Sequence, residues 1–171
     1  MTVDVGFHGR VRASGCRHLI LRTSWVYGLH GKNFLLTMDI SCYSFVAVGQ
    51  RAAAMMRPGG AMLSLTYLGA EKWVPHYNVM GVAKAALETS VKYLAADLGP
   101  EGIRVNAVRP GLIDTEIHAS GGLPNRAREL AHLVPMQRPG TAEEVAKAIV
   151  WLMGDDSSYT TGSVIDVTGG R

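Results

Sequence analysis

The stretch YNVMGVAK, from Tyr77 to Lys84, places a phenol and an amine seven residues apart. In a helix this spacing advances the chain by about two turns, so both side chains would lie on one face. A nearby ammonium stabilises a phenolate and lowers the pKa of a tyrosine below its free value of about 10. Such a phenol can donate a proton or a hydrogen bond to a carbonyl oxygen that gains negative charge. The pair therefore predicts general-acid or oxyanion-type catalysis, against the commoner alternative of two surface residues on a helix.

A second tyrosine, Tyr67, lies ten residues before Tyr77, at the end of the strand-like stretch AMLSLTYL. In open α/β sheets, active sites gather at the carboxyl ends of parallel strands. We therefore group Tyr67 with Tyr77 and Lys84 as catalytic candidates.

Apolar periodicity and turn residues divide the chain into alternating strands and helices. Pro75 is expected near the start of a helix that Gly99 ends, and Thr141 with Glu144 should form a capping box. The stretch 34–56 predicts one long buried helix or two shorter ones. The alternation predicts an α/β fold: a truncated, Rossmann-like, mostly parallel sheet of about four strands with helices on both faces. The expected strands cover 18–28, 61–68, 103–111 and 163–170, and the expected helices cover 34–56, 76–98, 125–133 and 142–153.

The composition indicates a single domain over residues 1–171, with residues 1–17 as a loop or frayed terminus. Hydrophobic residues make up 47 % of the chain and charged residues 18 %, which argues against disorder. The sequence has no apolar run of about 18 residues and no secretory signal, so we expect a cytoplasmic protein without membrane contact. Cys16 and Cys42 lack the spacing of a disulfide framework or a metal site, so we expect no metal.

The net charge of +3 is small and scattered, so we expect no nucleic-acid partner. The motif G-x-G-x-x-G, with which dinucleotide folds bind the pyrophosphate, does not occur. YGLHGKNF could weakly cradle an anion, but an ordinary strand-to-helix turn is the favoured interpretation. The least favoured hypothesis is a nucleic-acid or anion-binding module that uses basic residues near the start of the chain: Arg10, Arg12, Arg17, Arg22 and Lys32.

Residues 39–111, from DISCYSFVAVGQ through YNVMGVAKAALE to IRVNAVRPG, resemble the bacterial enoyl-acyl-carrier-protein reductases. These enzymes belong to the short-chain dehydrogenase/reductase superfamily. The resemblance implies that Tyr77 polarises the substrate carbonyl, that Tyr67 is the second active-site tyrosine, and that Lys84 holds the nicotinamide ribose. It also implies NAD or NADP as cofactor and an enoyl thioester as substrate.

The rear of the chain, from about residue 103 to residue 171, is similar to generic short-chain dehydrogenases. In those proteins the stretch after the Pro-Gly pair holds the nicotinamide carboxamide through backbone and hydroxyl contacts. Ile113 and Thr115 match that role, although Thr115 also fits an ordinary capping hydroxyl.

The front, from about residue 12 to residue 38, is similar to the dTDP-4-dehydrorhamnose reductases. The three resemblances imply a chimera with joints near 38–39 and between 103 and 115. They also imply a homo-oligomer that packs through the helices 39–56 and 76–98, in which the many alanines and methionines permit close contact. The alternative for these small residues is packing on their own sheet. The functional alternatives are therefore a nicotinamide-dependent reductase and a folded chimera that oligomerises without cofactor binding or catalysis.

Overall fold

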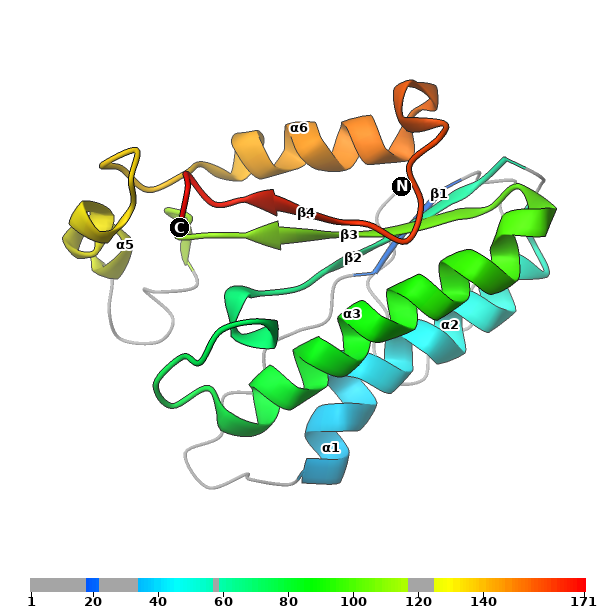
Figure 1. Ribbon diagram of the computed structural model, residues 1–171, viewed down its shortest axis with the longest axis horizontal. Helices are drawn as coiled ribbons and strands as arrows, with labels where there is room; N and C mark the ends of the chain where they lie inside the picture. Colours follow the sequence, from blue (N-terminus) through cyan, green and yellow to red (C-terminus); the bar gives the residue numbers. More distant parts are fainter. Residues whose placement is uncertain (1–17, 22–33, 57–58, 117–124) are drawn as a thin grey trace.

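A four-stranded parallel sheet forms the centre of the described chain (Figure 1). The computed structural model describes residues 18–21, 34–56, 59–116 and 125–171. All neighbouring strands pair in parallel, in the order β1-β2-β3-β4. The expectation of a parallel α/β sheet is thereby confirmed. The strands are β1 (His18–Leu21), β2 (Ala61–Leu65), β3 (Arg104–Pro110) and β4 (Val164–Val167).

Helices cover both faces of the sheet, also as expected (Figure 1). One face carries a helical run of α1, the π-helical turn η1 and α2, with α3 beside it, and the other face carries α6. The bounds are α1 (Phe34–Met38), η1 (Asp39–Tyr43), α2 (Ser44–Ala53), α3 (Asn78–Leu98) and α6 (Ala142–Met153). The shorter helical pieces are η2 (Leu68–Ala70), η3 (Gly99–Glu101), α5 (Arg126–Glu129), η4 (Ala131–Leu133) and η5 (Asp155–Ser157).

Alternation along the strands produces two apolar layers. Side chains of a strand point to opposite faces in turn, so Met62 packs under α2 and α3 while Leu63 packs under α6. Phe45 and Leu87 are fully buried in the first layer, and Leu152 is buried in the second. Because both faces of the sheet are covered, β2 is apolar at every position except the buried Ser64.

The stretch 34–56 is one helical run with a π-helical turn, and its first part is not buried. No residue of α1 is buried, so the expectation of a long buried helix is wrong there. Ala52 lies in the core, and Met56 and Ala86 pack against it, which agrees with packing on their own sheet. The proposed joint at 38–39 falls inside this run and stays a prediction.

The helix expected at 76–98 begins at Asn78. His76 adopts φ of 62°, which is left-handed, so the helix cannot extend back to Pro75. At its other end α3 stops at Leu98 with Gly99 as its C-cap, as expected, and a short η3 turn leads on to Gly102, which adopts the left-handed φ of 72°. The glycine rule therefore located the end of the helix correctly, whereas Pro75 lies three residues before its observed start.

The ends of α6 are held by side chains. Thr141 and Glu144 form the expected capping box: the hydroxyl accepts from the Glu144 amide at 3.3 Å, and the carboxylate accepts from the Thr141 amide at 2.9 Å. At the other end Arg104 donates to the carbonyls of Leu152 and Gly154 at 2.8 and 2.9 Å. No helix within the described ranges has the length and apolar character needed to cross a membrane.

Candidate active site

The two candidate tyrosines meet at the carboxyl edge of the sheet. Tyr67 follows β2, and Tyr77 directly precedes α3. Their ring centroids lie 4.9 Å apart with the planes tilted by 55°, a favourable aromatic geometry. Residues ten positions apart in sequence are thus brought into contact by the turn between β2 and α3.

Lys84 reaches the same edge from within α3. Its side chain is almost completely buried, and its Nζ donates to the carbonyl oxygen of Leu65, the last residue of β2, at 2.8 Å. Burial lowers the Lys84 pKa to about 8 from 10.5, opposed chiefly by the negative charge of Glu88. Tyr77 is the N-cap residue of α3, so it lies one residue before the helix that carries Lys84.

The ring of Tyr77 rests on glycine backbone. A Cβ atom built on Gly69 would lie only 2.2 Å from Cδ1 of Tyr77, and one on Gly81 would lie 2.8 Å from the Gly69 oxygen. His76 and Asn78, on either side of Tyr77, have φ of 62° and 20°. Backbone held in such rare conformations is found preferentially at functional sites. The absence of side chains at positions 69 and 81 lets the turn η2 approach the start of α3.

Ile113 and Thr115, the other cofactor-binding candidates, lie in the segment after β3. Ile113 forms an isolated parallel bridge with Gly140, and its side chain packs against the core under α6. Thr115 is exposed. Both follow the carboxyl end of β3, so they share the sheet edge with the tyrosines.

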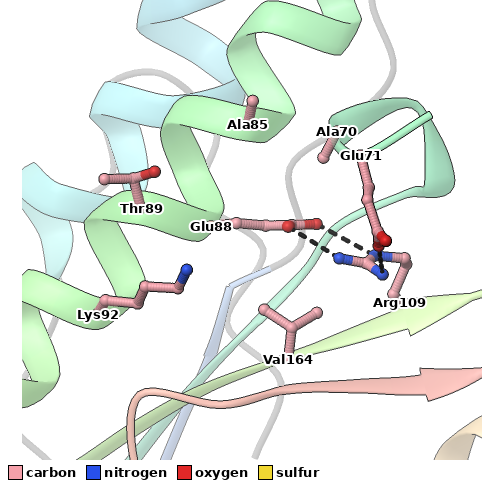
Figure 2. A pocket seen from close by; sticks show the side chains of 8 residues that line it. All are labelled: Ala70, Glu71, Ala85, Glu88, Thr89, Lys92, Arg109 and Val164. Carbon is pink, nitrogen blue, oxygen red and sulfur yellow. Dashed lines mark hydrogen bonds and ion pairs between the residues drawn. The ribbon is translucent and has the colours of Figure 1, made fainter. Parts of the chain in front are cut away.

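A buried arginine near the end of β3 was not predicted. Arg109, near the end of β3, donates from Nε and Nη2 to the two oxygens of Glu88 at 3.2 and 2.9 Å, and from Nη1 to Glu71 and Asp166 at 2.5 and 3.0 Å. Figure 2 shows the carboxylates converging on the guanidinium from α3 and from the turn after β2. Burial by itself would lower the Arg109 pKa. The hydrogen bond to Glu88 and the three negative charges together have a larger, opposite effect, so the pKa is raised.

Two sequence signals could have located this cluster. Glu88 lies one helical turn after Lys84, and Arg109 continues the two-residue alternation of Val105 and Ala107 on the face that meets α3. The pairing of Arg109 with Asp166, however, depends on the β3–β4 register, which no local pattern specifies.

A hollow of about 470 Å³ opens between α3 and β4 beside this cluster (Figure 2). In its walls, Glu71 and Glu88 each form an ion pair with Arg109. The fourth charged residue of the lining is the exposed Lys92. Its lining residues are Ala70, Glu71, Ala85, Glu88, Thr89, Lys92, Arg109 and Val164.

A search of the described ranges finds no group of three or more His, Cys, Asp or Glu side chains arranged to hold a metal ion. The basic residues considered for anion binding lie outside the described ranges, as does nearly all of YGLHGKNF.

Residues 8–171 match the sequence model of one protein family, described as Enoyl-(Acyl carrier protein) reductase. The enoyl-acyl-carrier-protein reductase (NADH) 1 of Rhizobium meliloti is 52 % identical over 141 residues, covering 81 % of this chain and 51 % of the relative. The corresponding Escherichia coli reductase (NADH) is 43 % identical over 149 residues, covering 85 % of this chain and 56 % of the relative. The chain therefore spans about half the length of the curated relatives it matches.

Solved structures agree with the sequence comparison. An enoyl-acyl-carrier-protein reductase from Anaplasma phagocytophilum in complex with NAD superimposes with a TM-score of 0.76 at 39 % identity, covering 90 % of this chain and 60 % of that one. A Bacillus cereus reductase with NADP+ and indole naphthyridinone superimposes with a TM-score of 0.77 at 40 % identity, covering 90 % and 64 %.

Replacing Lys84 by methionine should change how stability depends on pH. Between pH 8 and 10.5 the unfolded chain retains the Lys84 proton while the folded chain loses it, so folding becomes more favourable as pH rises. The unfolding free energy of the wild type should gain on the order of 3 kcal/mol relative to Lys84→Met across this range. Urea unfolding followed by circular dichroism measures it. Lys92→Met controls for loss of an exposed lysine on the same helix, and parallel wild-type and Lys84→Met curves would contradict the assignment.

Adding a methyl group at Gly69 should displace the ring of Tyr77. The clash at 2.2 Å leaves no room for a Cβ atom, so Gly69→Ala should destabilise the chain by roughly 1–3 kcal/mol and alter the near-ultraviolet circular dichroism of the tyrosines. Gly99→Ala is the matched control, because no heavy atom lies within 4 Å of its added Cβ and its φ is ordinary. Equal stability and unchanged spectra in both variants would disprove the contact.

Proposed function

Because the chain belongs to the enoyl-(acyl carrier protein) reductase family, we propose that it is a reductase of enoyl thioesters that uses NADH or NADPH. The supporting observation is the convergence of three groups at one sheet edge: two tyrosine rings 4.9 Å apart, and a buried lysine amine bonded to the carbonyl that ends β2. The substrate class, the cofactor and the roles of the residues below are all part of this proposal.

Tyr77 would donate a hydrogen bond to the thioester carbonyl oxygen and stabilise the negative charge that develops there. With a pKa of about 8, Lys84 is mostly protonated at pH 7, so its positive charge favours ionisation of a phenol nearby. Tyr67, in contact with Tyr77, would line the carbonyl site from the β2 side. When bound, the reduced nicotinamide supplies the hydride.

The residues present fit the nicotinamide end of such a cofactor. Lys84 would hold the ribose hydroxyls, and Ile113 and Thr115, at the same sheet edge, would contact the carboxamide. Relatives were solved with NAD or NADP+, which supports the cofactor class for this chain. The printed sequence has no G-x-G-x-x-G motif, so we expect weak affinity, and each tenfold loss corresponds to about 1.4 kcal/mol.

The second candidate is a chimera that folds and oligomerises without binding a cofactor. It is favoured by the absence of the glycine-rich motif from the sequence. One family model nevertheless matches residues 8–171, across both proposed joints, so the joints themselves gain no support from the comparison.

We further propose that the chain forms a homo-oligomer through η1, α2 and α3, the helices expected at 39–56 and 76–98. Tyr43, Val82 and Tyr93 expose large apolar side chains on these elements. A second copy of the same helices would remove this apolar surface from water, which is favourable.

Nicotinamide fluorescence should report saturable binding of NADH or NADPH to the chain. Lys84→Ala should weaken binding at least tenfold. Tyr77→Phe should retain binding but lower reduction of a trans-2-enoyl thioester by about 10²-fold or more, because the carbonyl loses its hydrogen-bond donor. Lys92→Ala is the control for loss of an exposed lysine from the same helix. Lack of binding at millimolar cofactor, with a cooperatively unfolding chain, would favour the chimera.

Multi-angle light scattering should give a mass of two or more times the 18.4 kDa of one chain. Val82→Glu combined with Tyr93→Glu should reduce that mass to the monomer, because charges would be buried at the proposed contact. Val150→Glu, at an exposed apolar position of α6 on the opposite face, should leave the mass unchanged. A monomeric wild type would reject the oligomer.

A further inference from the structure

Arg109 links four parts of the fold through one side chain. It projects from β3 and contacts Glu88 of α3, Asp166 of β4 and Glu71 just after the turn η2. The side chains of Arg109 and Glu88 are only 9 % and 13 % exposed, whereas those of Glu71 and Asp166 are 56 % and 53 % exposed. Solvent screens the latter two pairs, so the bidentate pair with Glu88 is the stronger anchor.

The segment 66–71 is held at both ends by this cluster. At its start, Thr66 donates from Oγ1 to Glu88 at 2.7 Å, to the same carboxylate oxygen that accepts from Nε of Arg109. At its end, Glu71 pairs with Nη1 of Arg109. Tyr67 and Gly69 lie between the two anchors, and the ring of Tyr77 contacts both.

Lys84 and Glu88, one turn apart on α3, bind consecutive residues of the chain, Leu65 and Thr66. Lys84 donates to the carbonyl of Leu65, and Glu88 accepts from the side chain of Thr66. Glu88 and Lys84 therefore tie the end of β2 and the residue that follows it to α3.

We propose that Arg109 is a positioning residue for the candidate active site. Through Glu88 and Glu71 it fixes both ends of the segment 66–71, which carries Tyr67 and supports the ring of Tyr77. This inference rests on the proposed function for its biological meaning, but the placement it describes can be measured without cofactor or substrate.

The same contact has an electrostatic consequence for Lys84. Among the described residues, Glu88 on the same helix raises the Lys84 pKa, and Cys42 on η1 also lies close enough to affect it. The charge of Glu88 raises the Lys84 pKa, and the guanidinium paired with Glu88 offsets part of that charge. Arg109→Gln should therefore raise that pKa by about one unit, and Glu88→Gln should lower it, because the arginine is then unbalanced.

The test is the Lys84 pKa measured by nuclear magnetic resonance on lysine-labelled protein without cofactor, with the signal assigned by its loss in Lys84→Met. Arg109→Lys should restore a value close to the wild type, and the double variant Arg109→Gln/Glu88→Gln should return toward it. Amide exchange at Ala70 and Glu71, which donate to Tyr67 and Leu68, should become at least tenfold faster in Arg109→Gln. Lys92→Gln, an exposed charge on the rim of the same hollow, should change neither quantity.

A purely structural role predicts a different pattern. Loosening the site would hydrate Lys84 and raise its pKa in Glu88→Gln as well as in Arg109→Gln, so a rise in both overturns the proposal, as does no change in either. If Arg109→Gln does not fold, the Lys84 pKa in Glu88→Gln decides between the two roles. A fall in that pKa supports the proposal, and a rise overturns it. Failure to bind NADH or NADPH would reject the proposed function and leave these results unaffected.

Discussion

The hydrogen bond from Lys84 to the Leu65 carbonyl joins α3 to the end of β2, and the site is arranged around it. A lysine side chain is rarely buried because its charge loses solvation, and this cost lowers the Lys84 pKa to about 8. A flexible side chain is thereby confined to one place at the carboxyl edge of the sheet. The first turn of α3, and with it Tyr77, is then constrained to lie against the turn after β2.

Glycines and rare backbone conformations allow this close approach. Gly69 and Gly81 leave no room for a Cβ atom against the Tyr77 ring and the facing backbone. The left-handed His76 permits the chain to turn before the helix begins. Conformations of this kind cost on the order of 1–3 kcal/mol each, so the surrounding contacts must offset them. The tight packing of two aromatic rings at this point is consistent with a rigid site.

The charged cluster around Arg109 orients the elements that it joins, and this role is separate from any contribution to stability. Replacing a buried ion pair by apolar groups is often neutral or stabilising, so such a pair is weak evidence for stability. A bidentate guanidinium does, however, fix the relative orientation of the elements it joins. In this chain those elements are β3, β4, α3 and the segment that carries Tyr67, which together surround the candidate site.

The sequence by itself determined the alternation of strands and helices, the parallel sheet covered on both faces, and the capping box of α6, because these follow from local periodicity and from residues three positions apart. It also predicted that Tyr67, Tyr77 and Lys84 act together in catalysis, which stays a prediction. Only the tertiary structure decided that Tyr77 precedes the helix, that its ring rests on Gly69, and that Arg109 pairs with Glu88, Glu71 and Asp166. These contacts join residues 8 to 57 positions apart, so they depend on strand register and helix placement, which are set by the packing of the whole chain and by no local pattern.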